Sequence, residues 1–487
     1  MRTGFDNEKY LKMQSQHIME RIQKFDNKLY LEFGGKLFDD LHASRVLPGF
    51  APDSKLQMLM QLADQAEIIM VVSADDIEKN KIREDLGITY DNDVFRLIDA
   101  FRSRGLYVSS VVLTKYADQH SLTHFQKRLE QIGIRVYHHY VIPGYPTNVP
   151  YIVSEEGYGK NDYIETTRPL VVVTAPGPGS GKMSTCLSQL YHEHKHGICA
   201  GYAKYETFPI WNLPLDHPVN LAYEAATADL NDINMIDPFH LKEYGVTTVN
   251  YNRDVEIFPV LNAMFIKIFG KNPYASPTDM GVNMAGNCII DDAICREASR
   301  QEIIRRYYQA IDGLANGTRT SEEVGKIQRL MSQENLSVTD RLVVPAALQK
   351  SEKTGGRPAV AIELPNGTIC TGKTGDLLGA SAAALVNALK ELADIPHDLP
   401  VLSPSAIAPI QTLKTEYLGS KNPRLHTDEV LIALSATAAE NESSALALKQ
   451  LPKLKGSQVH STVLLSPIDR KIFKRLLCDL TCEPKTQ

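Results

Sequence analysis

Short apolar, β-branched runs recur along the first part of the chain, and segments with helical spacing separate them. The apolar runs lie at residues 29–33, 67–73, 107–114, 134–140 and 170–173. Helical patterns cover residues 7–23, 94–103 and 122–132. Strands that are apolar on both faces are buried on both faces, and their alternation with helices is typical of a parallel sheet. The pattern therefore predicts an α/β protein whose N-terminal part has three layers, α/β/α, around a mainly parallel sheet.

The pattern changes twice further along. Residues 254–333 read as helical, apart from a polar interruption at 274–283. From residue 342 strands return, with a hairpin at 359–374, an alanine-rich helix at 377–392 and strands expected at 429–434 and 458–465. We therefore expect an N-terminal α/β domain at 1–233, a mainly helical subdomain at 234–335 and a C-terminal α/β subdomain at 336–487.

The apolar run at 170–173 leads into a glycine-rich turn, APGPGSGK, which ends in Lys182. Glycines allow backbone angles at which successive N–H groups converge on an anion at the start of a helix, and a lysine adds positive charge there. The turn thus predicts a phosphate cradle that binds a nucleotide cofactor. Its cofactor-binding residues would be Gly177, Gly179, Ser180, Gly181, Lys182, Ser184 and Thr185.

The turn departs from the P-loop pattern at two positions. Pro176 stands where the pattern has glycine, and Met183 stands where it has the Ser or Thr that contacts magnesium. Ser184 or Thr185 could supply that hydroxyl only if the helix begins one residue later. The alternative interpretation is a glycine turn that packs a helix closely against a sheet and binds nothing.

Residues 201–245, which follow the helix expected after this turn, are rich in polar and aromatic residues and contain the single tryptophan. Magnesium prefers carboxylate ligands, so acidic residues of this segment are candidates for metal ligand or general base. The catalytic candidates are Lys182, Glu206, Asp229 and Asp232. The candidates for substrate recognition are Tyr205, Glu206, Trp211, Asn212, Thr278, Asp279 and Asn283.

We expect these residues to meet in one cleft. Ligands of parallel sheets bind at the carboxyl ends of the strands, where the glycine turn falls. The polar segment should emerge at the same edge after a strand at 198–203, and residues 274–283 should form the opposite wall. Residues 143–169 would form a loop or hairpin that covers the site.

Two further motifs compete with the turn. Residues 367–374 match the P-loop pattern in every letter, but they lie in a hairpin; a second anion site at 372–374 stays open. HEHKH at 192–196 contains H-E-x-x-H, which suggests a zinc site with Glu193 as the base. No third ligand follows from the spacing, although Glu224 or His217 could be nominated, and Lys195 adds positive charge. We therefore expect no catalytic metal there.

Composition narrows the classes of partner. The chain has 487 residues, 43% of them hydrophobic, and a net charge of −6. That charge argues against general nucleic-acid or membrane-surface binding. The sequence has no secretory signal pattern, and its seven cysteines include no C-x-x-C pair, so we expect a cytoplasmic protein with reduced thiols. The expected partner is a small phosphorylated molecule, without nucleic acid or membrane, and we expect a homo-oligomer.

Several strings resemble one family. APGPGSGK at 175–182, YETFPIWNLP at 205–214, AYEAATADLND at 222–232 and SPTDMGVN at 276–283 are similar to the bacterial family described as domain of unknown function 1846. The resemblance implies a cytosolic bacterial protein with an α/β N-terminal part, a helical part and an α/β C-terminal subdomain. It supplies no activity. A weaker resemblance to amino acid kinases concerns the strand that ends in Phe33-Gly34-Gly35, although Glu32 stands where that group has lysine.

The sequence therefore predicts an enzyme that binds a nucleotide or a phosphorylated metabolite at 176–182, with ATP or another nucleotide and magnesium as the expected cofactors. Two alternatives stay open. One is a zinc-dependent hydrolase that uses 192–196. The other is a ligand-binding sensor without catalysis.

Overall fold

The computed structural model describes residues 3–35, 37–38, 40–83, 86–120 and 122–485. The chain divides into two compact units, which we treat separately. The N-terminal unit contains the residues up to 224 together with 231–296, and the C-terminal unit contains 225–230 together with 297–487. Residues 234–296, which the sequence assigned to a helical subdomain, therefore belong to the same unit as the N-terminal sheet.

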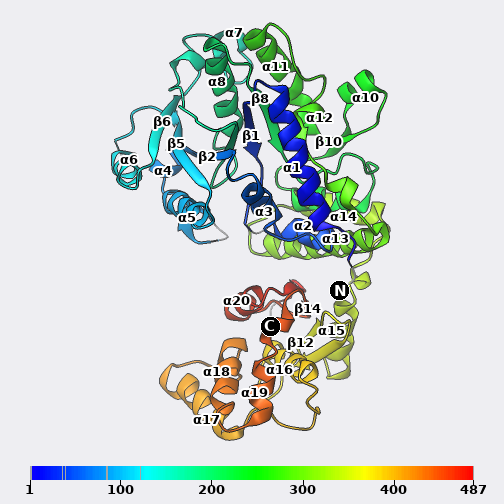
Figure 1. Ribbon diagram of the computed structural model, residues 1–487. Coiled ribbons are helices and arrows are strands. Elements are labelled where there is room, and N and C mark those ends of the chain that lie inside the picture. Colours follow the sequence, from blue (N-terminus) through cyan, green and yellow to red (C-terminus); the bar gives the residue numbers. More distant parts are fainter. Residues whose placement is uncertain (1–2, 36, 39, 84–85, 121, 486–487) are drawn as a thin grey trace. The chain divides into compact units, whose positions relative to one another are not determined.

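Seven parallel strands form the central sheet in the described part of the N-terminal unit (Figure 1). β1, β2 and β7 are buried along their whole length, as their uninterrupted apolar runs predicted. The α/β class and the parallel sheet are thus confirmed. In sheet order the strands are β11 (Gly281–Val282), β8 (Gly201–Tyr205), β1 (Leu29–Phe33), β7 (Leu170–Thr174), β2 (Ala66–Ser73), β5 (Tyr107–Tyr116) and β6 (Arg135–Tyr140).

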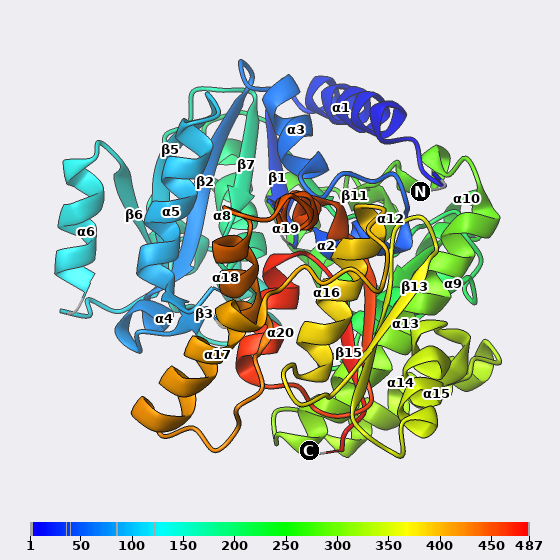
Figure 2. The same cartoon turned by 90° about the horizontal axis from the view of Figure 1, so that it is seen from below.

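Helices pack on both faces of this sheet. On one face Tyr10 of α1 (Asn7–Lys24) shares a 2.5 Å hydrogen bond with Tyr205. On the other, Tyr30 donates to Glu193 of α8 (Lys182–Lys195) at 2.5 Å. Figures 1 and 2 show β1 between these two helices.

The remaining elements of the N-terminal unit surround this core. The helices are α2 (Leu41–Val46), α3 (Ser54–Gln61), α4 (Ala74–Glu78), α5 (Tyr90–Arg102), α6 (Leu122–Gln131), α7 (Val149–Ile152), α10 (Pro238–Tyr244), α11 (Asn252–Phe269) and α12 (Pro277–Met280). Two short antiparallel pairs join β3 (Ile82–Arg83) to β4 (Ile88–Thr89) and β9 (Asn234–Ile236) to β10 (Val249–Tyr251). α9 (Pro218–Ala226) and α13 (Asp292–Ala315) each extend into both units.

The strand expected at 198–203 lies further along the chain, at β8. Ile198 instead caps the end of α8, because its N–H donates to the carbonyl of Glu193 at 2.9 Å after the left-handed Gly197. Pairing with β1 then starts at Gly201 opposite Leu29. As a consequence, Tyr205 is the last residue of the strand, whereas the sequence pattern placed it after the strand.

The polar stretch 274–283 is not a separate wall opposite the sheet. It contains the short helix α12 and β11, which pairs with β8 through Gly281 opposite Lys204. A strand of two residues has no readable alternation of apolar and polar positions, so the sequence pattern did not reveal it. Thr278 and Asp279 therefore precede the edge strand, and Asn283 follows it.

The C-terminal unit has a mixed four-stranded sheet in its described part, in the order β13, β12, β14, β15. The predicted hairpin is present, with Ala359 opposite Lys373. The strands are β12 (Ala359–Glu363), β13 (Ile369–Lys373), β14 (Gln458–Ser461) and β15 (Asp479–Cys482). The helices are α14 (Ser321–Gln333), α15 (Val343–Lys353), α16 (Ala380–Leu392), α17 (Pro404–Thr412), α18 (Thr427–Thr437), α19 (Glu442–Leu448) and α20 (Pro467–Arg475).

The strand expected at 429–434 is wrong, because these residues lie within α18. Val430, Ala433 and Leu434 are the buried residues of the run, which is helical spacing, whereas Ile432 is 65% exposed. Glu429 accepts a hydrogen bond from the backbone N–H of His426 at 2.8 Å and so caps the first turn. This capping interaction favours a helix at 429–434, although the apolar residues of the run alone suggested a strand.

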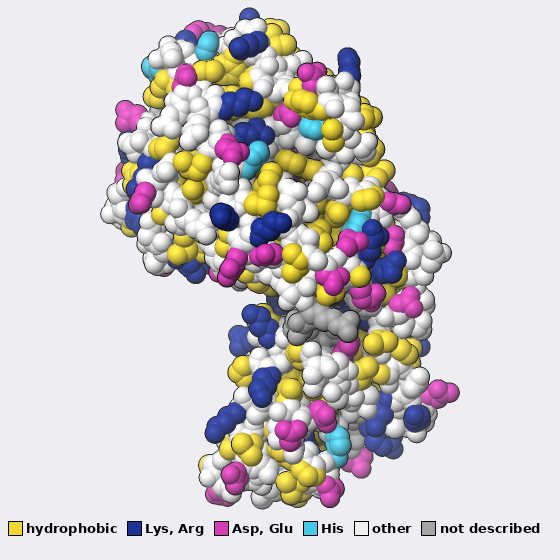
Figure 3. All heavy atoms as spheres, turned by 45° about the vertical axis from the view of Figure 1, so that its right-hand side comes forward, with side chains coloured by type: hydrophobic (Ala, Val, Ile, Leu, Met, Phe, Trp, Pro, Cys, Tyr) yellow, Lys and Arg dark blue, Asp and Glu magenta, His cyan; other side chains and the backbone are white. Residues whose placement is uncertain are grey.

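Charged side chains of both signs are mixed over the face in Figure 3, where Lys and Arg alternate with Asp and Glu. This distribution agrees with the small net charge of −6. No helix among the described residues is long and apolar enough to cross a bilayer.

Candidate functional site

The glycine-rich turn, residues 175–181, connects the carboxyl end of β7 to α8. Neighbouring groups hold it in place from two sides. The hydroxyl of Thr114, on β5, donates to the carbonyl of Ser180 at 2.6 Å, and Ser180 in turn donates from its hydroxyl to the carbonyl of Gly177 at 2.7 Å. A Cβ atom on Gly177 would lie 2.3 Å from the hydroxyl oxygen of Tyr90, so this glycine allows a close contact with the ring.

The other two glycines shape the backbone. Gly179 and Gly181 have φ values of 71° and 92°, in the region that side chains disfavour. The first hydrogen bond of α8 is donated by Thr185 to the carbonyl of Gly181 at 2.9 Å. Within the part of the chain that the structure describes, the amides of Gly179, Gly181 and Lys182 have no acceptor. The turn thus presents N–H groups at the N-terminus of a 14-residue helix.

Lys182 is half-buried at the first position of this helix. Burial raises the pKa of Cys186, one turn further on, well above its usual range; the charge of Glu32 adds to this, and Lys182 opposes it. Both side chains therefore lie near the same turn of α8. Of the two candidate hydroxyls, Ser184 is half-buried and lies beside Tyr145, whereas Thr185 is completely buried. Only Ser184 is open to a ligand.

A cluster of charged side chains lies where β8 ends. The ammonium group of Lys204 donates to both carboxylate oxygens of Asp254, at 2.7 Å each, and to the hydroxyl of Tyr251 at 2.6 Å. It also pairs with Glu206 at 2.8 Å, and Tyr251 donates its hydroxyl proton to the same Glu206. We call these four residues the Lys204 cluster. β8 supplies Lys204, Glu206 is the first residue after that strand, and the start of α11 supplies Asp254.

The neighbouring strand β1 adds a further carboxylate. Glu32 pairs with Lys204 across the two strands, is 7% exposed and accepts a 2.7 Å hydrogen bond from Tyr202. The turn after β1 reaches the cluster as well, because a Cβ atom on Gly34 would lie 3.5 to 3.6 Å from side-chain atoms of Glu206. β8 and β7 flank β1, so the Lys204 cluster and the glycine turn are two strand spacings apart, roughly 10 Å.

The electrostatics of the cluster are unbalanced. Burial favours the neutral form of Lys204, but Asp254, Glu206 and Glu32 together raise its pKa above the usual value. Burial raises the pKa of Glu206 to about 7; Lys204 opposes this shift and the charge of Asp254 adds to it. One lysine cannot neutralise several buried carboxylates. Because the pKa of Glu206 is raised to about 7, this carboxyl group binds a proton near neutral pH. A carboxyl group with such a pKa can act as a general acid or base at pH 7.

The two candidate aspartates lie in different compact units. Asp232, in the N-terminal unit, is 2% exposed at its side chain and forms a 3.1 Å ion pair with Arg253. Asp229, in the C-terminal unit, is 44% exposed at its side chain and lies 3.5 Å from Arg319. Both carboxylates therefore have a cationic partner within their own unit.

Most of the residues proposed for substrate recognition bond within the fold. Tyr205 is completely buried and stacks on Phe33 with ring centroids 4.3 Å apart. Thr278 donates to Asp237 at 2.6 Å, and Asn283 donates to the carbonyls of Thr207 and Pro209 at 3.0 Å each.

The remaining three are at least partly exposed. Asp279 accepts a 2.9 Å hydrogen bond from Tyr244. Asn212 is exposed, and Trp211 is half-buried with its ring against Gly281. Since Asp279 precedes the edge strand β11, it lies toward the amino end of the sheet, whereas Lys182 follows the carboxyl end of β7.

The HEHKH residues also contact the protein. Glu193 is 1% exposed and accepts from Tyr30, while a ring nitrogen of His192 bonds the carbonyl of Tyr158 at 3.0 Å. The ring of His196 packs against Tyr163 with centroids 4.6 Å apart. Among the described residues, no three His, Cys, Asp or Glu side chains are grouped as a metal site would require.

Sequence reasoning did not select Lys204, Asp254, Tyr251 or Glu32. One signal was available, because Tyr202, Lys204 and Glu206 alternate along the strand, and Glu32 interrupts an otherwise apolar run. Polar residues that share one face of a buried strand need partners, so such a pattern indicates a polar cluster. The partners themselves come from β10 and α11, about fifty residues further along the chain.

The fold and this edge define an α/β protein with a glycine-rich turn between a strand and a helix, beside a buried cluster of lysine and carboxylates. Comparison with known proteins identifies the family. Residues 3–335 match the N-terminal domain of unknown function DUF1846, and residues 339–487 match its C-terminal domain. The chain belongs to this family.

Full-length relatives occur in several bacteria. The chain is 57% identical over 483 residues to the UPF0371 protein cu0538 of Corynebacterium urealyticum, covering 99% of this chain and 97% of that protein. It is 56% identical over 484 residues to the UPF0371 protein SUB1165 of Streptococcus uberis, covering 99% and 98%. The same coverage and 56% identity hold for the UPF0371 protein str1377 of Streptococcus thermophilus.

Proposed function

We propose that this protein is an enzyme that binds a nucleotide or another phosphorylated metabolite at the turn 176–182, with Glu206 as its general acid or base. The observation that carries the proposal is the set of amides at Gly179, Gly181 and Lys182, which have no acceptor in the described part of the chain. Unpaired N–H groups at the start of a long helix attract anions, through hydrogen bonds and through the helix dipole.

Close packing explains why two of the three glycines of the turn are needed, but not the third. Gly177 is needed for the contact with Tyr90, and a Cβ atom on Gly181 would approach the side chain of Thr114 at 3.1 Å. Gly179 is different, because a Cβ atom there would meet no atom within 4 Å, and the residue is exposed. Its left-handed conformation therefore serves the direction of the backbone amides and not the packing of α8 on the sheet.

Lys182 supplies the positive charge of the phosphate site, and the half-buried hydroxyl of Ser184 is placed to contact a magnesium ion that accompanies the phosphates. Thr185 does not suit that role because its hydroxyl is buried. The turn and the Lys204 cluster are roughly 10 Å apart. A nucleotide or a phosphorylated sugar can span this distance. Glu206, with a pKa of about 7, can then exchange a proton with the part of the ligand beyond the phosphate.

The test is ligand-dependent thermal stability of the full-length chain, with and without magnesium, across nucleotides and sugar phosphates. A ligand at about 100 times its Kd stabilises the folded state by about 2.7 kcal/mol. Lys182→Ala should abolish the shift in melting temperature. Lys195→Ala removes the same charge at the exposed other end of α8 and should keep it.

A shift of equal size in the Lys182→Ala protein would contradict the proposal. Turnover separates an enzyme from a sensor. Glu206→Gln should keep the ligand-dependent shift and lose the reaction, whereas binding without any turnover in the unmodified protein would indicate a sensor.

A further inference from the structure

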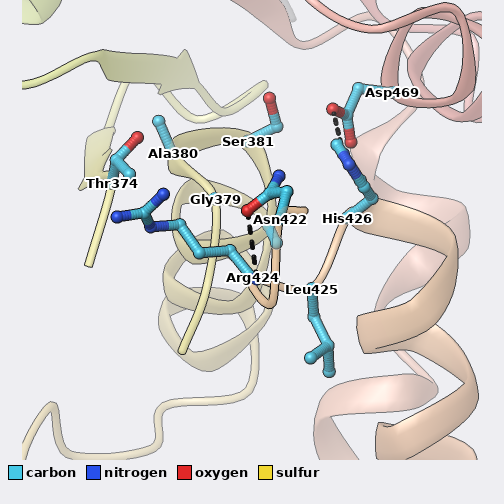
Figure 4. A pocket seen from close by; sticks show the side chains of 10 residues that line it. Thr374, Gly379, Ala380, Ser381, Asn422, Arg424, Leu425, His426 and Asp469 are labelled. Atoms are coloured by element: carbon cyan, nitrogen blue, oxygen red, sulfur yellow. Dashed lines mark hydrogen bonds and ion pairs between the residues drawn. The ribbon is translucent and has the colours of Figure 1, made fainter. Parts of the chain in front are cut away.

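The C-terminal unit contains a small cavity at the start of α16 (Figure 4). Its volume is about 40 Å³, and it is lined by the first residues of α16, by Thr374 after β13 and by the loop before α18. A larger hollow of about 350 Å³ shares Thr374 and Arg424 with it. A single water needs roughly 10 to 15 Å³ measured in this way, so the small cavity suits a group the size of a phosphate.

Backbone donors line one side of the cavity. α16 has 13 residues, and its first internal acceptor is the carbonyl of Gly379, which binds the amide of Ala383 at 2.9 Å. The amides of Ser381 and Ala382 have no acceptor within the described ranges. Both residues line the cavity.

A hydroxyl on a buried residue, without a hydrogen-bond partner in the described part of the unit, is the second, independent observation. Ser381 is 3% exposed and lines the cavity, yet no group in the described part of the unit hydrogen-bonds its side chain. Its hydroxyl oxygen is not among the fully enclosed side-chain atoms that lack a partner, so it is reached from the cavity and is available to water or a ligand. Figure 4 shows this side chain among the lining groups.

Arg424 supplies the charge. Its Nε donates to the carbonyl of Gly375 at 2.7 Å, which anchors the guanidinium group, and Figure 4 shows that group directed toward Thr374. The carboxylate of Asp469, on the opposite wall, accepts from Thr427, from Ser466 at 2.8 Å and from His426 at 3.0 Å, so its hydrogen bonds are made within the protein. Among the described groups that line the cavity, the donors without an acceptor thus include backbone amides, the hydroxyl of Ser381, the side-chain amide of Asn422 and the terminal nitrogens of Arg424.

We propose that this cavity binds the phosphate group of a small phosphomonoester, with Ser381, the first amides of α16 and Arg424 as its ligands. The rest of the ester occupies the adjoining larger hollow, which Arg357 also lines. The sequence suggested an anion site at 372–374, but Gly372 and Lys373 end β13, only Thr374 lines the cavity, and the backbone donors come from α16 instead. The proposal is independent of the site at 176–182.

Calorimetric titration of the full-length Lys182→Ala protein tests the proposal, because that background removes the contribution of the turn. The probes are inorganic phosphate and ribose 5-phosphate. Adding Arg424→Ala or Ser381→Ala should weaken the binding of ribose 5-phosphate, at least tenfold for Arg424→Ala, since charged hydrogen bonds to phosphate are strong. Lys421→Ala, which removes an exposed charge from the same loop, should leave binding unchanged.

Ser381→Ala keeps the test decisive if Arg424→Ala disturbs the loop. Its hydroxyl has no partner in the described part of the fold, so the melting temperature of the free protein should not fall while affinity does. Unchanged affinity in both variants would overturn the proposal. Tighter binding of inorganic phosphate than of ribose 5-phosphate would overturn the assignment of the larger hollow to the ester.

Discussion

Replacing Glu206 with glutamine should remove a specific part of the pH dependence of stability. The folded-state pKa of Glu206 is raised from 4.5 to about 7, so the folded protein holds this proton more tightly than the unfolded chain does. Between these two pH values the folded state binds more protons, and stability therefore falls as the pH rises. The contribution is fully present below pH 4.5 and is lost above pH 7.

The size of the effect follows from the shift. One pKa unit corresponds to about 1.36 kcal/mol, so a shift from 4.5 to about 7 is worth about 3 kcal/mol. The side chain of Glu206 is 21% exposed, so solvent screens the shift only in part. Glutamine keeps an oxygen that accepts from Lys204 and Tyr251 but has no charge. Its stability relative to the unmodified protein should therefore rise by about 2 to 3 kcal/mol between pH 5 and pH 8.

The assay is denaturant unfolding followed by the fluorescence of Trp211. This is the single tryptophan of the chain, and its ring packs on Gly281 within the N-terminal unit, so the signal reports on the unit that holds the cluster. Glu165→Gln is the matched control, because that carboxylate is 73% exposed at its side chain. If the curves for Glu206→Gln and the unmodified protein run parallel from pH 5 to pH 8, Glu206 does not titrate near neutrality and its acid–base role is refuted.

Two further substitutions test how the sheet edge is built. Gly177→Ala should destabilise the N-terminal unit by about 1 to 3 kcal/mol in the same assay, because its Cβ atom would lie 2.3 Å from the hydroxyl of Tyr90, and the added Tyr90→Leu should recover part of the loss. Tyr30→Phe should cost about 1.5 to 3 kcal/mol, since it removes the 2.5 Å hydrogen bond to the buried carboxylate of Glu193; an unchanged midpoint would show that this hydrogen bond does not contribute to stability.

Local sequence patterns determined most of the N-terminal sheet. β1 lies at the predicted residues, and β2, β5 and β6 differ from their predicted bounds by at most two residues at either end. β1, β2 and most of β5 are apolar runs that are buried on both faces, whereas β6 is an edge strand with one buried residue. The predictions were wrong where strand pairing or helix capping determines the bounds of an element. β8 begins where Gly201 pairs with Leu29, and Glu429 caps the first turn of α18, where a strand was predicted.

In the candidate site, too, the sequence revealed the part whose contacts are local and not the part whose contacts are long-range. The glycine turn was visible because its chemistry is local: three glycines and a lysine follow one strand. The Lys204 cluster was not, because its contacts join residues far apart in the chain, from Glu32 to Asp254. Sequence alone shows that Lys204 lies in a buried strand, but not which carboxylates surround it.

The number of carboxylates around Lys204 determines which chemistry is available at the carboxyl edge of the N-terminal sheet. A lysine paired with one carboxylate would only stabilise the fold, whereas Lys204 has Asp254, Glu206 and Glu32 around it and cannot neutralise all of them. The excess negative charge must be relieved by a proton or by a bound cation, and the proton at Glu206 is the one whose pKa lies near 7. Folding thus places a titratable group at the carboxyl edge of a parallel sheet, roughly 10 Å from amides that attract an anion. In the function we propose, an anion held at the turn and a proton exchanged at Glu206 act on the same ligand.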